Sequence, residues 1–238
     1  MMNENGIRVN KFIADSGVCS RREADRLIDA GKVLINGEIV EPGMRVFDGD
    51  KVSVNGKLIS LEEKKLYFAF NKPVGVVCTA EKKEKNNIID YIGYEKRLVY
   101  AGRLDKESEG LIILTNDGDI VNEMMRARNH HEKEYIVTVN KKITDEFITK
   151  MESGVYIEEL DTTTRRCKVI PVDNNIFRIV LTQGLNRQIR RMCETLGYKV
   201  VSLKRDRIMN IMLNDLPVGK MRSLTNEELT ELKGLLNG

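Results

Sequence analysis

Apolar residues follow two different spacings along the chain, and the change between them separates a shorter first part from a longer second part. In the first part, helical spacing between residues 9 and 30 gives way to short alternating runs at 33–40 and 51–54, which predicts two helices followed by strands. The second part is dominated by strand-like runs, at residues 66–70, 98–100, 111–114, 133–139, 156–160 and 176–182. Its helical stretches are fewer, at residues 118–128, 143–151 and 188–197. We therefore predict an α+β protein with a mixed, mainly antiparallel central sheet.

Turn and capping residues refine this division. Ser20 and Glu23 form a capping-box pattern that opens the second helix. The pair Asn36-Gly37 is typical of a two-residue hairpin turn. From these signals we predict a small first domain at residues 7–57, a charged connector at 58–66 and a second domain at 67–238.

Composition excludes several classes of protein. The chain has 238 residues, of which 41% are hydrophobic and 32% charged, and none of its apolar runs is long enough to span a membrane. The net charge of +3 is too small for a basic tail, so a nucleic-acid site must come from basic residues gathered on one face. Four widely spaced cysteines without a Cys-x-x-Cys pair indicate reduced thiols in a cytoplasmic protein. The adjacent His130 and His131 have no third ligand at a suitable spacing, so we expect no metal.

A polar loop, Arg103–Gly110, lies between two predicted strands and carries the carboxylates Asp105, Glu107 and Glu109. Loops that are held by strands at both ends often carry chemistry. Spacing alone leaves three interpretations open. The carboxylates match early places of a calcium-binding loop, although its twelfth place holds Asn116 instead of glutamate. The loop can also be an acidic surface turn, or Asp105 can be a nucleophile or base that an arginine keeps ionised.

Arginines gather in two places on predicted helices. The clusters are Arg21, Arg22 and Arg26 on the second helix, and Arg187, Arg190 and Arg191 near the start of the helix at 188–197. Side chains three and four residues apart are neighbours on a helix, and a helix N-terminus favours a carboxylate or phosphate. In both places the alternative is an ordinary solvated basic face.

Several motifs of the second part resemble the signature of pseudouridine synthases, enzymes that convert uridine to pseudouridine in RNA. These motifs are Gly102-Arg103-Leu104-Asp105, Ser108-x-Gly110-Leu111, Leu114-Thr115-Asn116-Asp117-Gly118, Lys133-x-Tyr135 and Asn186-Arg187-Gln188-Ile189-Arg190-Arg191-Met192. An upstream Lys72-Pro73 pair resembles a further motif of the family, for which we expect a structural role. The resemblance is to the RsuA/RluF branch, which modifies ribosomal RNA. Within it, Ile208-Met209-Asn210 and the arginine-rich motif are most similar to the large-subunit RluF type.

The first part resembles the small RNA-binding domain first seen in a protein of the small ribosomal subunit. The matching segments are Val9–Gly17, Ser20–Ala24 and Val33–Gly37. This domain accompanies the catalytic domain in the same branch of synthases. The resemblance therefore extends over nearly the whole chain.

The resemblance implies a role for individual residues. Asp105 matches the catalytic aspartate, Tyr135 the tyrosine that stacks on the flipped uracil, and Arg190 the arginine that pairs with the aspartate. The expected RNA-binding residues are Arg21, Arg22, Arg26, Arg103, Arg187 and Arg191. The reaction needs neither redox chemistry nor phosphate energy, so no cofactor is implied.

We therefore expect a cytoplasmic, monomeric enzyme that isomerises a specific uridine in ribosomal RNA, most similar to those acting on 23S RNA. One alternative is a 16S RNA pseudouridine synthase of the same branch. Another is an RNA-binding ribosome assembly factor without catalytic activity, which the arginine clusters would suit equally well. The combination of Asp105, Tyr135 and Arg190 favours the enzyme, because a protein that only binds RNA has no need of it.

Overall fold

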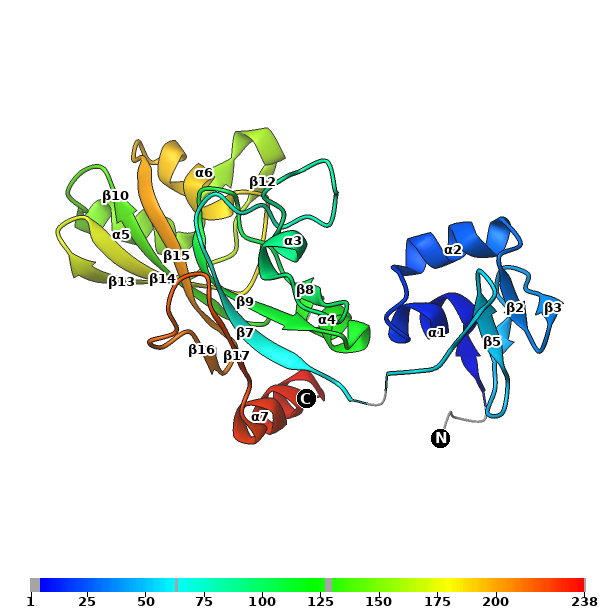
Figure 1. Ribbon diagram of the computed structural model, residues 1–238. Coiled ribbons are helices and arrows are strands. Elements are labelled where there is room, and N and C mark those ends of the chain that lie inside the picture. The colour runs from blue at the N-terminus through cyan, green and yellow to red at the C-terminus, as the bar shows by residue number, and fades with distance from the viewer. Residues whose placement is uncertain (1–4, 63, 127–129, 238) are drawn as a thin grey trace. The chain divides into compact units, whose positions relative to one another are not determined.

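The computed structural model describes residues 5–62, 64–126 and 130–237, and the chain divides into two compact units (Figure 1). The first unit comprises Met1–Leu66 with the short segments Tyr94–Val99 and Asn116–Gly118, and the second comprises Tyr67–Gly93, Tyr100–Thr115 and Asp119–Gly238. Separate groups of buried apolar residues lie in the two units. Each unit therefore has a core of its own.

The first unit begins with two helices and continues as strands. Its elements are β1 (Ile7–Arg8), α1 (Val9–Asp15), α2 (Arg21–Asp29), β2 (Val33–Ile35), β3 (Glu38–Ile39), β4 (Arg45–Val46), β5 (Val52–Val54) and β6 (Lys57–Ile59). The sheet has the order β3-β2-β5-β6, and β1 pairs with β4. Phe12 and Ile13 of α1 pack with Ile28 of α2 in the core. The predicted helix start is confirmed, because the Ser20 side chain accepts a hydrogen bond from the Glu23 amide at 3.2 Å.

The connector predicted at 58–66 begins instead as a strand. Leu58 and Ile59 belong to β6, which pairs with β5 in antiparallel register. The physical reason is a second hairpin turn at Asn55-Gly56, where both residues adopt positive φ angles of 50° and 75°. This turn has the same chemistry as Asn36-Gly37, which joins β2 to β3 with φ angles of 54° and 91°.

From residue 67 onward the chain alternates strands with short helices. The elements are β7 (Tyr67–Lys72), α3 (Ile88–Ile92), β8 (Val99–Ala101), β9 (Glu109–Thr115), α4 (Gly118–Met125), β10 (Lys133–Val139), α5 (Asp145–Ser153), β11 (Tyr156–Ile157), η2 (Glu158–Leu160), β12 (Thr162–Thr163), β13 (Lys168–Asp173), β14 (Ile176–Leu181), α6 (Gln188–Thr195), β15 (Val200–Ile208), β16 (Ile211–Met212), β17 (Met221–Ser223) and α7 (Asn226–Asn237). The central sheet has the order β13-β14-β10-β15-β9-β7-β17, with β16 beside β15 and β8 beside β9. Only the β15–β9 pairing along this path is parallel among the described strands. The predicted mixed, mainly antiparallel sheet is confirmed.

Helices cover the sheet through apolar side chains. Ile120 and Met124 of α4 and Leu232 of α7 share one core cluster with Ile113 of β9. Phe147 of α5 packs edge-on against Phe177 of β14, with ring centroids 5.5 Å apart. None of the described helices has the length and apolar character needed to cross a lipid bilayer.

Two predicted elements differ from the structure. The run at 156–160 is only partly a strand, because β11 ends at Ile157 and η2 turns the chain toward a left-handed Asp161, with φ of 44°. The helix predicted at 118–128 is present as α4 as far as Met125, and residues 127–129 lie outside the described residues.

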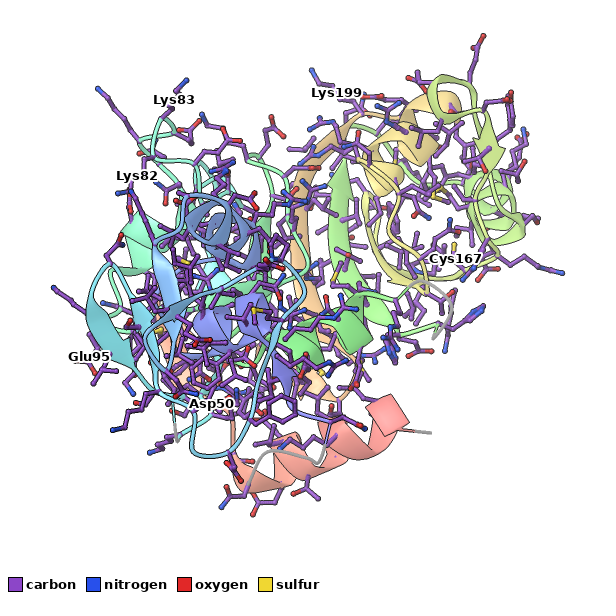
Figure 2. All side chains as sticks on the ribbon, turned by 90° about the vertical axis from the view of Figure 1, so that its right-hand side faces the viewer. Asp50, Lys82, Lys83, Glu95, Cys167 and Lys199 are labelled. Carbon is purple, nitrogen blue, oxygen red and sulfur yellow. The ribbon has the colours of Figure 1, made fainter. Side chains whose placement is uncertain are left out.

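Exposed Lys82 and Lys83 lie on the loop before α3, and half-buried Cys167 lies before β13 (Figure 2).

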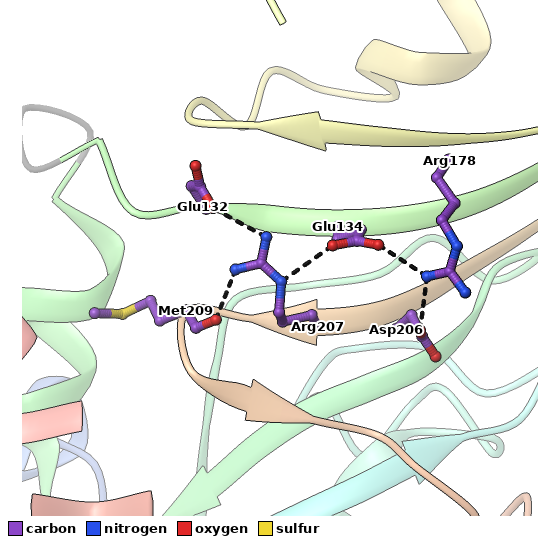
Figure 3. A network of polar contacts seen from close by, with 6 residues as sticks. All are labelled: Glu132, Glu134, Arg178, Asp206, Arg207 and Met209. Atoms are coloured by element: carbon purple, nitrogen blue, oxygen red, sulfur yellow. Dashed lines mark hydrogen bonds and ion pairs between the residues drawn. The ribbon is translucent and has the colours of Figure 1, made fainter. Parts of the chain in front are cut away.

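A β-bulge between β10 and β15 sorts side chains between the two faces of the sheet. Glu134 pairs with Arg207, but Tyr135 pairs with Arg205, so Asp206 is an extra residue on β15. On one face, Glu134 accepts hydrogen bonds from Arg178 at 2.8 Å and Arg207 at 3.1 Å (Figure 3). Although burial pushes the pKa of Glu134 upward, the hydrogen bonds and the positive charges of Arg178 and Arg207 together lower it. The opposite face is left to Tyr135 and Arg205.

Candidate active site

The Asp105 loop, defined here as residues 102–108, connects β8 to β9. Gly102 turns out of β8 with φ of 81°, a conformation that suits glycine. The Ser108 amide donates to the Asp105 carbonyl at 3.1 Å, which closes a tight turn around Asp105. Leu104 is buried and its amide donates to the Cys78 sulfur at 3.4 Å. The turn hydrogen bond and the contact of Leu104 with Cys78 therefore fix the loop, while Asp105 itself stays partly exposed.

Lys72 fastens the end of this loop. Its side chain is fully buried at the end of β7, and Nζ donates to the carbonyls of Ser108 and Pro73, each at 2.8 Å. Burial lowers the pKa of Lys72, and the nearby Cys78 and Asp105 oppose that effect. The Lys-Pro motif thus has the structural contacts that the sequence led us to expect.

Two arginines of the α6 segment lie within ion-pair distance of the Asp105 carboxylate. Arg190 Nε and Arg187 Nη1 each lie 3.7 Å from Asp105 Oδ2. Arg190 is almost buried and also donates from Nη2 to Ser108 Oγ at 3.1 Å and to the Glu107 carbonyl at 3.2 Å. Arg187 donates to Glu107 Oε2 at 3.0 Å, and this hydrogen bond is the main cause that lowers the pKa of Glu107. The carboxylates of the loop therefore face fixed positive charge.

The start of α6 aims these arginines. Arg187 adopts a left-handed conformation with φ of 51° immediately before the helix. The buried Gln188 accepts a hydrogen bond from the Leu185 amide through Oε1 at 3.1 Å and donates from its own amide to the Leu185 carbonyl at 3.2 Å. This local turn sends Arg187 and Arg190 toward the Asp105 loop. Arg191 points elsewhere, with Nη1 3.4 Å from Glu159 Oε2.

A cavity of about 400 Å³ opens beside the Asp105 loop. Residues from β10, β15, α6 and the loop itself surround it. Its lining includes Arg103, Leu104, Asp105, Lys106, Ser108, Met125, Lys133, Tyr135, Leu181, Gln183, Asn186, Arg187, Leu203 and Arg205. The volume lies in the range of pockets that enclose a small ligand. Tyr135 is 9% exposed, so its ring forms part of the wall.

The structure brings together the three residues expected to be catalytic. Asp105 and Tyr135 line one cavity, and Arg190 contacts the Asp105 loop from outside it. Of the expected RNA-binding residues, Arg103 and Arg187 line the cavity as well. The others lie on helix surfaces: Arg21, Arg22 and Arg26 on α2, and Arg191 on α6. Arg26 is paired with Glu23 of its own helix at 2.8 Å.

No grouping of three or more His, Cys, Asp or Glu side chains suited to a metal ion occurs among residues 5–62, 64–126 and 130–237. All four cysteines are free thiols. Burial raises the pKa of Cys167 to about 11 and that of Cys193 to about 12, so both stay protonated near neutral pH. Neither of these two thiols lines the cavity.

Comparison with known proteins decides the family. A family profile described as RNA pseudouridylate synthase matches residues 66–195, which is more than half of the chain. The chain belongs to the RNA pseudouridylate synthase family. A second profile, described as the S4 domain, matches residues 7–52 in the first unit. The resemblance inferred from the motifs is thereby confirmed, and the protein is an isomerase.

Individual members of this family are similar over almost the entire chain. The chain is 53% identical to the dual-specificity RNA pseudouridine synthase RluF of Salmonella typhi, over all of the chain and 82% of that protein. It is 35% identical to ribosomal large subunit pseudouridine synthase B of Bacillus subtilis, over 96% of both chains. A crystal structure of a pseudouridylate synthase superposes with a TM-score of 0.70, at 30% identity, over 95% of this chain and all of that one.

The sequence did not reveal three side chains of this synthase that line the cavity. Met125 has the spacing of a core residue on α4, but it is 48% exposed at the cavity wall. Cys78 lies between strands, where no motif marks it. In the sequence, residues 203–208 indicate only a basic strand or turn, and strand alternation does not separate Arg205 from Arg207. The bulge at Asp206 makes that separation.

Proposed function

We propose that this enzyme isomerises a specific uridine of ribosomal RNA, with large-subunit (23S) RNA as the substrate and Asp105 as the catalytic residue. The observation that carries the proposal is a partly exposed carboxylate at the edge of the cavity, flanked by two guanidinium groups at 3.7 Å. At this distance the two cations attract the carboxylate and favour a position that faces them. An acidic surface turn would need no such arrangement.

The reaction breaks the C1′–N1 bond of uridine and joins C1′ to C5 of the same base. The hydrogen on C5 leaves to solvent as a proton and N1 gains a proton, so the composition of the nucleotide is unchanged and no electrons are gained or lost. The target base must leave its stack before the enzyme can reach it. We assign Asp105 to the ribose or pyrimidine, Tyr135 to stacking against the extruded base, and Arg190 to orienting Asp105. Because these groups are held in fixed positions around the nucleotide, less entropy is lost when the reaction begins, and this lowers the barrier.

The choice of RNA rests on similarity to named relatives. The Bacillus subtilis relative is named for the large ribosomal subunit, and the RluF relatives are named dual-specificity RNA synthases. We therefore place 23S RNA first and keep 16S RNA as the alternative. A second modified site would fit the dual-specificity name. Ribosomal RNA as substrate implies a cytoplasmic enzyme, for which a monomer stays our prediction. Family membership removes the non-catalytic assembly factor from the alternatives.

Pseudouridine mapping tests the choice of substrate. Total RNA from cells that lack this protein should miss a pseudouridine in 23S RNA, and the wild-type gene should restore it. A missing site in 16S RNA alone would overturn the assignment to the large subunit. Mapping all RNA classes in the same samples shows whether a second site depends on the protein.

Asp105→Asn tests the catalytic assignment, because asparagine keeps the shape of aspartate and loses its charge. We expect tritium release from RNA labelled at uridine C5 to fall at least about 10³-fold, from the loss of an essential group. RNA affinity and the melting temperature should change little. Glu107→Gln is the matched control, since Glu107 also pairs with Arg187 but is more exposed than Asp105. Release near the wild-type rate in Asp105→Asn would refute the assignment.

A further inference from the structure

Arg205 of β15 is a buried cation directly behind the Asp105 loop. It is 2% exposed, and its guanidinium reaches the main chain on both sides of the loop. Nε donates to the Leu111 carbonyl in β9 at 2.7 Å, and Nη1 donates to the Arg103 carbonyl at 3.3 Å. One side chain thus connects the entry of the loop to the strand that follows it.

The energetics of Arg205 indicate a purpose other than stability. No carboxylate lies within ion-pair distance of it among the described residues, and its buried Nη2 has no hydrogen-bond partner there. A buried charge without a counterion and a buried donor without an acceptor both destabilise a fold. An apolar side chain of similar length would fill the space at lower cost. Departures of this kind concentrate at functional sites.

The main chains of β9 and β15 lie very close together at Gly110 and Arg205. Gly110 pairs with Arg205 in the parallel β9–β15 register. A Cβ atom at Gly110 would lie 2.3 Å from the Arg205 carbonyl oxygen and 2.6 Å from its amide nitrogen, so only glycine fits. The bulge at Asp206 then turns Arg205, and not Arg207, toward this side. The backbone of Arg205 therefore pairs with β9 directly after the Asp105 loop, and its side chain contacts the loop itself.

We propose that Arg205 is a positioning residue for the reaction, which fixes the backbone of the Asp105 loop while Arg190 fixes the carboxylate. This inference rests on the proposed role of Asp105. Arg190 acts from α6 on the side chain and on the Glu107 carbonyl, whereas Arg205 acts from β15 on the Arg103 and Leu111 carbonyls. The two arginines thus restrain different parts of one loop. A displacement of about 1 Å at a reacting group is enough to cost roughly 10²-fold in rate.

The test compares Arg205→Met and Arg205→Lys with the control Arg222→Met. Arg222 also donates to a main-chain carbonyl, that of Met212 at 3.1 Å, but it does not line the cavity. Each full-length variant is assayed for single-turnover rate at saturating RNA, RNA dissociation constant and melting temperature. We expect Arg205→Met to be about 50-fold slower or more, with RNA affinity within threefold of wild type. Arg205→Lys should recover part of the rate, because an ammonium group can keep one of the two hydrogen bonds. Arg222→Met should melt at a lower temperature and react at a rate within threefold of wild type.

Several outcomes would overturn the proposal. One is a rate for folded Arg205→Met within threefold of wild type, and another is a loss of RNA affinity that accounts for the loss of rate. If Arg205→Met does not fold, Arg205→Lys decides, and a wild-type rate in that variant refutes positioning. Asp105→Asn is measured beside them. Activity in Asp105→Asn would refute the proposed function itself, whereas an inactive Asp105→Asn with a normal Arg205→Met would refute only the role of Arg205.

Discussion

Replacing Arg190 by alanine is expected to slow the chemical step about 30-fold. A charge pair separated by about 4 Å in a partly buried site is worth on the order of 4 kcal/mol, and Arg190 Nε lies 3.7 Å from Asp105 Oδ2. Part of this interaction survives the substitution, because Arg187 lies at the same distance from the same oxygen. If about half is lost, the cost is about 2 kcal/mol, which corresponds to roughly 30-fold in rate.

Arg187 should matter less for the rate than Arg190. Its side chain is 40% exposed, against 10% for Arg190, so solvent screens its charge more strongly. It also divides its charge between Asp105 and Glu107. For Arg187→Ala we expect a cost of at most about 1 kcal/mol, or about fivefold in rate. Arg191→Ala should leave the rate at saturating RNA unchanged, because Arg191 pairs with Glu159 instead of the loop.

Single-turnover tritium release at saturating RNA measures this ranking, and filter binding of the same RNA separates affinity from rate. Arg190→Lys should fall between wild type and Arg190→Ala, since lysine keeps a charge but cannot place one nitrogen beside Asp105 and another beside Ser108 and Glu107. A rate for Arg190→Ala within threefold of wild type would refute the reasoning. So would a larger loss of rate in Arg187→Ala than in Arg190→Ala.

Two further predictions concern RNA affinity and stability. The double substitution Arg22→Ala/Arg26→Ala should weaken RNA binding and make the slope of log affinity against log salt shallower by about one for each phosphate that the protein no longer neutralises. The control Lys150→Ala removes a similarly exposed helical ion pair and should change neither the affinity nor the slope. An unchanged slope in the double variant would mean that the α2 face is only solvated. Glu134→Gln should lower the melting temperature at pH 7 by several degrees, from a loss of about 2 kcal/mol. Because the folded protein lowers the pKa of Glu134, its stabilising effect is full above the unfolded pKa near 4.3 and is lost as the pH falls through the folded value. Melting curves of both proteins should therefore converge in strong acid, and a constant difference down to about pH 2 would contradict this account.

Local signals predicted the parts of the fold that depend on neighbouring residues. Ser20 caps α2 and Thr144 caps α5 because a hydroxyl at that place can satisfy an amide that the helix leaves unpaired. The same kind of evidence was present for the hairpin at Asn55-Gly56, where the turn residues outweigh the charged composition that follows. The apolar runs on both sides of Asp105 also predicted its two flanking strands, but the loop expected at Arg103–Gly110 is shorter, because Glu109 and Gly110 already belong to β9.

The details of the candidate site depend on contacts between distant segments. Motif similarity pointed to Asp105 and Arg190, and the ion pair between them is present. Motif similarity did not show that Arg187 would approach the same carboxylate oxygen. The direction of this side chain follows from the left-handed conformation of Arg187 itself, just before α6. The role inferred for Arg205 depends on a bulge that no local pattern marks.

That bulge explains how one strand can serve two opposite environments. In a regular strand, Arg205 and Arg207 would point to the same face, and two guanidinium groups would crowd the cavity. The extra residue Asp206 turns Arg207 to the other face, where Glu132 and Glu134 neutralise it at 2.9 Å and 3.1 Å. Glu134 is the residue next to Tyr135, so the ion pairs on that face hold β10 in the register that presents Tyr135 to the cavity. A stable polar network on one face thus fixes the position of the aromatic ring on the other, while the remaining buried arginine is able to restrain the Asp105 loop.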